Sequence, residues 1–204
     1  AVVNMALALD RRVAVNLNYT VSSEVLNACT QQCGIRRILT SRKVMEKMNF
    51  DLEAEVVYLE DLREKIKLTD KLAGVSGTYL MPAALLDRLL GLNKIQSDDI
   101  LTVIFTSGST GTPKGVMLTH GNIGSNIEAI DQVVKLKTSD VVLGVLPFFH
   151  SFGFTITLWT VMTTSVKGAY HFNPLDAKQV GKLSEKHDGT ILLATPTFLR
   201  TYLR

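Results

Sequence analysis

The stretch DDILTVIFTSGSTGTPKG, residues 98–115, joins an apolar run of strand length to a segment dense in glycine and hydroxyl residues. Eight of the ten residues from Thr106 to Gly115 are Gly, Ser or Thr, and Lys114 stands among them. Glycines let main-chain N–H groups turn toward one point, hydroxyls add donors, and the lysine adds a mobile positive charge. This composition predicts a cradle for phosphate oxygens; the alternative is a solvated turn, which is built from the same residue types.

Two familiar phosphate-binding loops are excluded by the spacing around Lys114. A Walker loop requires G-x-x-x-x-G-K-[ST], whereas Pro113 precedes this lysine and Gly115 follows it. A dinucleotide fingerprint requires G-x-G-x-x-G at the start of a helix, and this spacing does not occur. The segment therefore needs another explanation.

Segments of strand length alternate with segments of helical period along the chain. Strands are predicted over residues 12–18, 36–41, 54–62, 98–105, 141–146, 168–172 and 190–195. Helices are predicted over residues 22–34, 42–48, 123–134, 152–164, 174–189 and 196–204, with two more pieces between residues 65 and 92. This order predicts an α/β fold with a mainly parallel sheet and flanking helices. In such sheets ligands bind beyond the carboxyl ends of the strands, which is where residues 106–115 are expected.

Composition places the chain among ordinary globular proteins. Its 204 residues are 46% hydrophobic and 20% charged, which is far from a disordered composition. The 22 basic and 19 acidic residues give a net charge of +3 without a run of like charge, so nothing indicates nucleic-acid binding. Cys29 and Cys33 are four residues apart, which predicts two small buried thiols in a reducing compartment.

A charge-free segment raises the question of a membrane. Residues 141–166 contain no Asp, Glu, Lys or Arg, a span long enough to cross a bilayer. Because the segment includes Pro147, His150 and a β-branched start, we expect a buried strand, a loop and a buried helix instead. The apolar start of the chain also lacks the preceding positive charges of a secretory signal, and we expect a cytoplasmic protein.

Three motifs together resemble the adenylate-forming superfamily, which includes acyl-CoA synthetases, luciferases and peptide-synthetase adenylation domains. Residues 106–115 match its signature [ST]-S-G-[ST]-T-G-x-P-K-G, and residues 146–153 (LPFFHSFG) resemble its second motif, L-P-x-F-H-x-x-G. Residues 194–204 (ATPTFLRTYLR) resemble the stretch that borders the acyl pocket. With VNLNYT, ILTSRK and VYLEDL included, the chain looks most like the synthetase part of bacterial 2-acylglycerophosphoethanolamine acyltransferase/acyl-[acyl-carrier-protein] synthetases.

The resemblance implies ATP-dependent activation of a fatty acid in the presence of Mg²⁺. The carboxylate attacks the α-phosphate, pyrophosphate leaves, and the acyl group then passes to the thiol of acyl carrier protein. A fatty-acid:CoA ligase and a non-catalytic nucleotide-binding module are the alternatives. Because the family's adenine-binding G-Y-G-x-T-E does not occur in the chain, residues 1–204 are expected to be an incomplete piece of the large N-terminal AMP-binding domain, without the C-terminal lid domain and inactive alone. Any membrane association, at the cytoplasmic face of the inner membrane, would come from domains outside this chain.

The resemblance also implies roles for individual residues. Lys114 neutralises the departing pyrophosphate, Thr106 approaches the metal ion, and His150 lies beside the acyl-adenylate. On the residues alone, an exposed turn lysine and a packed histidine are the alternatives. Phe149 walls the acyl pocket, which Thr195 and Thr197 border. The residues implied to wrap the phosphates are Thr106, Ser107, Gly108, Ser109, Thr110, Gly111, Lys114 and Gly115.

Overall fold

The computed structural model describes residues 1–106 and 113–203. Its strands are β1 Ala14–Val15, β2 Arg37–Thr40, β3 Glu55–Tyr58, β4 Ile100–Thr106, β5 Lys114–Thr119, β6 Val141–Gly144, β7 Lys167–Tyr170 and β8 Ile191–Leu192. Its helices are α1 Val2–Leu9, α2 Ser23–Gln32, α3 Arg42–Met48, α4 Leu59–Lys65, α5 Leu68–Leu80, α6 Ala83–Leu90, η1 Leu92–Lys94, α7 His120–Val134, η2 Gly153–Thr160, α8 Val161–Thr163, α9 Ala177–His187 and α10 Pro196–Tyr202.

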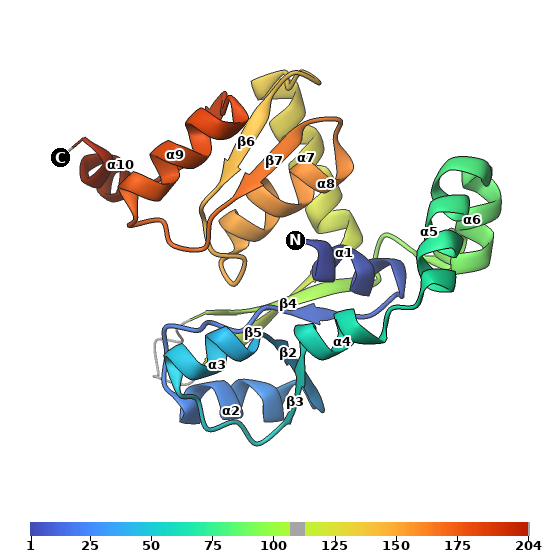
Figure 1. The fold of residues 1–204 in the computed structure, drawn as a ribbon, viewed down its shortest axis with the longest axis horizontal. Helices are drawn as coiled ribbons and strands as arrows, with labels where there is room; N and C mark the ends of the chain where they lie inside the picture. Colours follow the sequence, from blue (N-terminus) through green and yellow to red (C-terminus); the bar gives the residue numbers. More distant parts are fainter. Residues whose placement is uncertain (107–112, 204) are drawn as a thin grey trace.

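The strands form small sheets that helices cover (Figure 1). Within the described ranges the strand orders are β1-β4-β5, β2-β3 and β7-β6-β8. Every pair is parallel except β4 with β5, which is antiparallel. The predicted α/β class with mainly parallel strands is therefore confirmed, although the strands are divided among separate sheets instead of one.

Strand β5 is the main departure from the sequence-based expectation. Residues 106–115 were predicted to form one loop, but Lys114 begins β5 and pairs with Thr106, while Gly115 pairs with Phe105. The segment 114–119 is short and largely apolar, so it can add to the free edge of β4. Its main-chain N–H and C=O groups then hydrogen-bond to those of β4. Lys114 and Gly115 thus lie in a strand, and only residues 107–112 of the predicted loop fall outside the described residues.

Several predicted strands are shorter in the structure. The strand expected over residues 54–62 ends at Tyr58, because Glu60 and Asp61 fit the first turn of a helix, α4. β1 and β8 are two residues each, where longer strands were expected. These differences leave the order of elements unchanged.

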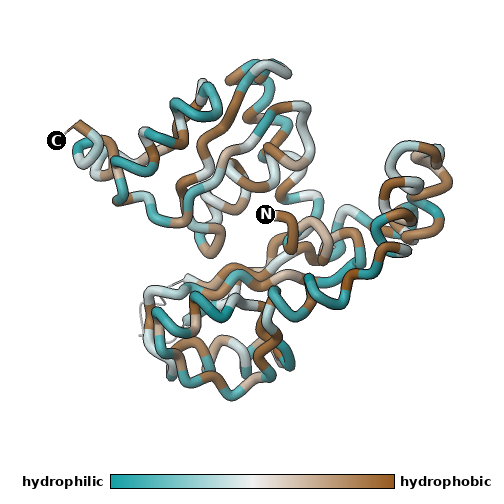
Figure 2. Tube along the Cα trace, viewed as in Figure 1, coloured by the Kyte–Doolittle hydropathy of each residue, from teal (hydrophilic) through white to brown (hydrophobic). Residues whose placement is uncertain are grey.

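The charge-free segment forms a strand, a loop and a buried helix, as predicted. All four residues of β6 are buried, and the strand is coloured mainly as hydrophobic in Figure 2. Residues 153–160 form the π-helical turns of η2, and Phe154 and Leu158 are fully buried there. No helix in the described part of the chain combines the length and hydropathy needed to cross a bilayer.

The main core joins η2 to α7 and β4. Thr102 of β4 is fully buried, and its hydroxyl donates to the Ala14 carbonyl oxygen at 2.6 Å, which ties β1 to the same layer. The buried cluster comprises Leu101, Ile104, Ile123, Ile127, Phe154, Leu158 and Trp159. This core fixes the direction in which β4 leads toward the predicted phosphate segment.

Tyr170 links β7 to η2, and its ionisation should make the free energy of unfolding fall at alkaline pH. Its hydroxyl donates to the Thr157 carbonyl oxygen at 3.0 Å, and burial raises the pKa of this tyrosine from 10 to about 12. In the unfolded chain the phenol ionises first as pH rises, so its stabilising contribution is complete below pH 10 and is lost between pH 10 and about 12. We expect Tyr170→Phe to reduce the alkaline loss of stability, measured by urea unfolding at a series of pH values. Because burial also raises the pKa of Tyr19 and Tyr202, the slope should shrink without vanishing; an unchanged slope would contradict the assignment.

Candidate active site

The described parts of the first predicted motif, Thr106 and residues 113–115, lie where the antiparallel strands β4 and β5 pair. Thr106 and Lys114 are exposed and face each other across β4 and β5. A Cβ at Gly115 would lie 3.0 Å from Val103 Cγ1 and 3.3 Å from Phe105 Cε1, so glycine leaves the room that these side chains use. The strand pair therefore brings one hydroxyl and one ammonium to the same place, a pairing suited to phosphate oxygens.

The second motif is a compact turn between β6 and η2. The His150 amide donates to the Pro147 carbonyl oxygen at 3.2 Å, and the Phe154 amide donates to the His150 carbonyl oxygen at 2.9 Å. Gly153 packs so closely on this turn that a Cβ would overlap the Pro147 carbonyl oxygen and lie 3.1 Å from the Leu146 carbonyl carbon. Gly153, the last residue of the motif, is thus required because the backbone of Leu146 and Pro147, its first two residues, leaves no room for a side chain.

An open cleft of about 1710 Å³ brings the two motifs together. The strand pair contributes Val103, Gly115 and Met117 to its lining, and the segment around β6 and β7 contributes Gly144, Phe149 and Tyr170. The structure thus unites Gly115 and Phe149, which were predicted separately. Their neighbours Lys114 and His150 are exposed and do not line the cleft themselves.

The acyl-pocket residues are divided by the structure. Phe149 is buried, and its ring lies 4.6 Å from that of His150. Thr195 instead caps α10, where its hydroxyl accepts from the Phe198 amide at 3.4 Å. Thr195 and Thr197 are exposed and lie outside the cleft lining, so their contact with an acyl chain stays a prediction. Ser107, Gly108, Ser109, Thr110 and Gly111 lie outside the described residues, and their phosphate contacts also stay predictions.

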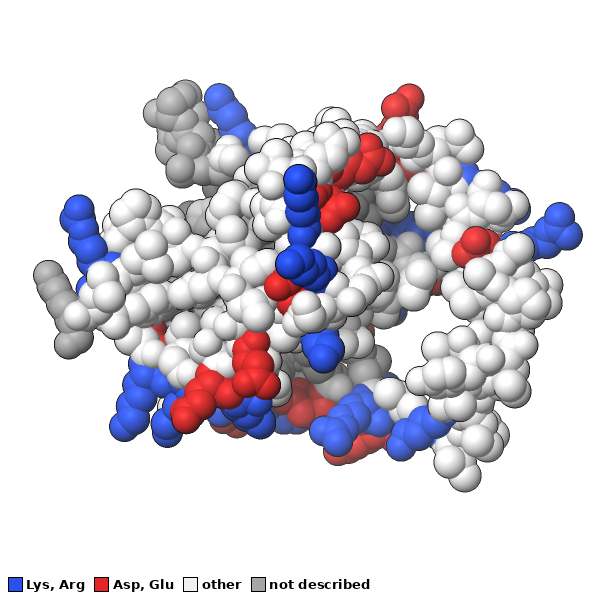
Figure 3. All heavy atoms as spheres, turned by 90° about the horizontal axis from the view of Figure 1, so that it is seen from above, with Lys and Arg blue, Asp and Glu red and all other residues white. Residues whose placement is uncertain are grey.

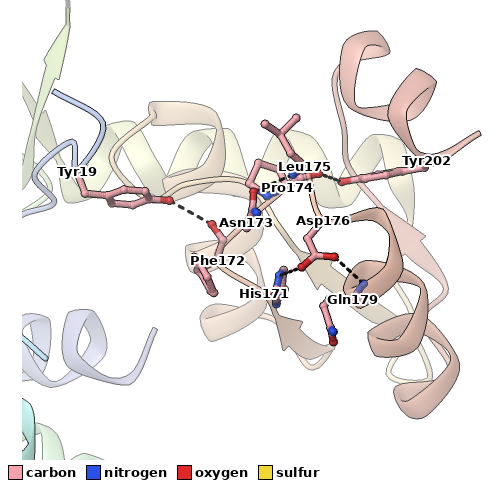
Figure 4. A network of polar contacts seen from close by, with 9 residues as sticks. All are labelled: Tyr19, His171, Phe172, Asn173, Pro174, Leu175, Asp176, Gln179 and Tyr202. Carbon is pink, nitrogen blue, oxygen red and sulfur yellow. Dashed lines mark hydrogen bonds and ion pairs between the residues drawn. The ribbon is translucent and has the colours of Figure 1, made fainter. Parts of the chain in front are cut away.

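Tyr19 is a cleft residue that the sequence analysis missed. Its ring meets Phe149 edge to face at 5.0 Å, and its hydroxyl donates to the Phe172 carbonyl oxygen at 3.2 Å (Figure 4). Burial raises the pKa of this phenol above its ordinary value, so the group remains a donor at neutral pH. Tyr19 and Phe172 are 153 positions apart, and no spacing rule connects them. Tyr19 therefore ties the first part of the chain to the segment that follows β7.

The segment after β7 is held from a second side as well. Tyr202 of α10 donates to the Pro174 carbonyl oxygen at 2.6 Å, and Asp176 accepts from the Gln179 amide at 3.1 Å (Figure 4). His171 lines the cleft, and its Nε2 atom lies 3.9 Å from Asp176 Oδ2, which is too far for a hydrogen bond. The polar contacts thus fix the rim of the cleft between Tyr19 and α10.

A Tyr19→Phe variant is expected to lose about 0.5–1 kcal/mol of unfolding free energy, the usual range for one partly exposed hydrogen bond. Urea unfolding measures the change. Tyr79→Phe is the matched control, because Tyr79 is 81% exposed and its substitution should leave stability unaltered. If both variants unfold alike, the bond between Tyr19 and Phe172 contributes nothing.

Comparison with solved structures identifies the fold. The chain matches o-succinylbenzoate CoA synthetase (MenE) from Bacillus subtilis in complex with the acyl-adenylate OSB-AMP, with a TM-score of 0.74, 21% identity, and coverage of 98% of this chain and 47% of that one. The same enzyme in complex with ATP and magnesium ion matches with a TM-score of 0.71, 21% identity, and coverage of 98% and 38%. The fold is that of roughly half of an adenylate-forming enzyme.

Family membership follows from the sequence comparison. The profile of the AMP-binding enzyme family matches residues 1–204, and the chain belongs to that family. A long-chain-fatty-acid–CoA ligase of Bacillus subtilis is 38% identical over 118 residues, which cover 53% of this chain and 20% of that protein. The matched segment thus covers about a fifth of the length of this curated relative.

Proposed function

We propose that these residues belong to an enzyme that activates a fatty acid with ATP and passes the acyl group to the thiol of coenzyme A. One observation carries the proposal: Gly115 of the first motif and Phe149 of the second line the same cleft. A fatty carboxylate held near Phe149 and a triphosphate held near the β4–β5 hairpin would then lie within one space. The similarity to a fatty-acid–CoA ligase supports the choice of both the acid and the acceptor.

The described residues suit the charges that this reaction creates. The carboxylate oxygen forms a bond to the α-phosphorus, and the bond from that phosphorus to the leaving pyrophosphate breaks. Lys114, exposed at the start of β5, supplies a positive charge for the departing oxygens, and charge-assisted contacts of this kind are strong. The Thr106 hydroxyl, across the strand pair from Lys114, would be the group that approaches Mg²⁺. Thiol attack on the acyl carbon afterwards releases AMP.

His150 is proposed to donate a hydrogen bond to the carboxylate or phosphate oxygen during adenylate formation. His150 is exposed, and its ring lies beside that of Phe149, which lines the cleft. In the whole protein that carries this chain, we expect His150→Ala to slow carboxylate-dependent ATP–pyrophosphate exchange by at least about tenfold, since one general acid or hydrogen-bond donor typically contributes about a hundredfold or more. His187→Ala on α9 is the control. Undiminished exchange in His150→Ala would remove this histidine from the proposal.

The acceptor is tested separately from the activation step. We expect the whole protein to form acyl-CoA from ATP, a long-chain fatty acid and coenzyme A faster than it acylates holo acyl carrier protein. The acyl carrier protein is the second candidate, because VNLNYT, ILTSRK and VYLEDL resemble the acyl-[acyl-carrier-protein] synthetases. Preference for the carrier protein would reverse the choice of acceptor, while the absence of pyrophosphate release with both acceptors would favour a non-catalytic nucleotide-binding module.

A further inference from the structure

The segment from Lys65 to Lys94, here called the α5–α6 hairpin, projects from the rest of the molecule. It contains α5, the connection through Met81 and Pro82, and α6. Neither helix has a buried residue. The pair extends to the right of Figure 1, away from the β4–β5 hairpin and from β6 and β7. Helices that pack onto a core normally bury one face, so these two lack a partner within the described residues.

An apolar stripe runs along α5 on the face turned away from α6. Leu68, Leu72, Val75 and Tyr79 recur at intervals of four, three and four residues, which places them on one side of a helix. Their exposed fractions are 71%, 61%, 57% and 81%. Gly77 lies on the opposite side, where a Cβ would be 3.9 Å from Leu86 Cδ1 of α6. The stripe is therefore not the contact between the two helices.

The hairpin also carries the net charge of the whole chain. Residues 65–94 contain two acidic residues, Asp70 and Asp87, and five basic ones. Lys67, Lys71 and Arg88 lie in the two helices or at the cap of α5, while Lys65 ends α4 and Lys94 ends η1. Because the chain has 22 basic and 19 acidic residues, 17 of each remain elsewhere and cancel. The arm on the right of Figure 3, which is this hairpin, presents mainly uncharged atoms. The hairpin thus combines an exposed apolar stripe with a surplus of positive charge.

The basic residues of α5 border the stripe instead of interrupting it. Lys67 and Lys71 each directly precede a stripe residue, so both lie along one edge. Asp70 points to another side, where its carboxylate accepts from the Lys67 amide at 2.8 Å and caps the helix. Lysines at the edge of an apolar face place their ammonium groups at headgroup level while the face enters the interface.

We propose that the α5–α6 hairpin docks the stripe of α5 onto the surface of an anionic lipid bilayer. The helix lies in the plane of the interface, the four stripe residues enter the boundary of the acyl chains, and Lys67 and Lys71 meet anionic headgroups. A second copy is a poorer occupant, because α5 has 13 residues and a stable coiled coil needs more than this length. An acidic carrier protein is also a poorer occupant, because the hairpin points away from β4, β5, β6 and β7, which contribute to the lining of the cleft that its thiol must reach.

Co-sedimentation with lipid vesicles tests the apolar part of the proposal. We expect the protein to bind vesicles of phosphatidylcholine with phosphatidylglycerol more strongly than vesicles of phosphatidylcholine alone. Leu72→Glu with Tyr79→Glu should lower the ratio of bound to free protein at least about tenfold, since two side chains leave the interface and two negative charges enter it. The matched control is Val133→Glu with Leu175→Glu, at sites that are 82% and 57% exposed and lie outside the hairpin. It should bind as well as the unchanged protein.

A second pair of variants tests the charge. Lys67→Gln with Lys71→Gln should weaken binding to the phosphatidylglycerol vesicles and leave the weak binding to neutral vesicles unaltered. Lys178→Gln with Lys182→Gln, with the same spacing on α9, should change neither. Circular dichroism confirms that all variants fold, and vesicle binding is read without any catalytic assay, so it stands apart from the proposed function.

Three results would overturn the proposal. In the first, Leu72→Glu with Tyr79→Glu binds vesicles as its control does. In the second, neutral and anionic vesicles bind equally. In the third, size-exclusion chromatography shows a dimer that this double variant dissociates while vesicle binding persists, which would assign the stripe to a second copy of the chain.

Discussion

A Gly153→Ala variant is expected to lose about 2–3 kcal/mol of unfolding free energy, the upper part of the range for overpacking a well-filled site. The added methyl group would overlap the Pro147 carbonyl oxygen and stand 2.9 Å from the carbonyl carbon of the same residue. Both atoms belong to the backbone of a turn whose residues hydrogen-bond to one another. A change of side-chain rotamer therefore cannot relieve the contact. Relief requires η2 to move away from β6, which disturbs the buried Phe154 and Leu158.

Urea unfolding followed by circular dichroism measures this loss. Gly124→Ala is the matched control, because a Cβ at that position of α7 meets nothing within 4 Å. Alanine is the better helix former by up to about 1 kcal/mol, so this control should be as stable as the unchanged protein or more so. Equal stability of the two variants would mean that the turn before η2 accommodates a methyl group and that the close packing at Gly153 does not govern the motif.

A Lys114→Ala variant of the whole protein is expected to slow adenylate formation at least about tenfold, and up to a few hundredfold if the ammonium contacts the departing oxygens directly. Lys114 is exposed at the first position of β5, opposite Thr106, so its removal should change the unfolding free energy by less than about 0.5 kcal/mol. Pyrophosphate release, measured with saturating fatty acid, reports the rate. A slower release of pyrophosphate with an unchanged unfolding free energy would indicate that Lys114 acts in the reaction and not in the fold.

Two further variants sharpen the test of Lys114. Lys114→Arg keeps the charge but spreads it over a planar group, so a partial recovery of the rate is expected. Lys178→Ala on α9 removes an exposed lysine elsewhere and should leave the rate unaltered. An unchanged rate of pyrophosphate release in Lys114→Ala would take this residue out of the reaction.

The sequence predicted most of the fold because its strands and helices carry strong local signals. The buried run Val141–Gly144 and the amphipathic α7 were evident from composition and period alone. β5 was missed because its six residues follow a glycine-rich segment and lead directly into α7, which Thr119 caps, so the run is too short to show a strand pattern of its own. β5 forms because the free edge of β4 is available for pairing. The sequence of residues 114–119 alone does not reveal that partner.

The sequence predicted the motifs of the candidate site but not the cleft that brings them together. The residues around Lys114 and His150 were recognised from their local patterns, and the structure supplied their common cleft through Gly115 and Phe149. Tyr19 carries no such pattern, because its contacts with Phe149 and Phe172 arise only when distant segments pack together. The need for glycine at position 153 likewise lies in the backbone of Pro147, which a sequence does not display.

The strand that follows residues 107–112 has an electrostatic consequence for nucleotide binding. In a Walker loop a helix begins directly after the glycine-rich turn, and its macrodipole favours the triphosphate without any side chain. Here β5 takes that position, and sheets have little net dipole. Under the proposed function, Lys114 adds its attraction as a solvent-exposed point charge, so we expect affinity for ATP to decline as ionic strength rises.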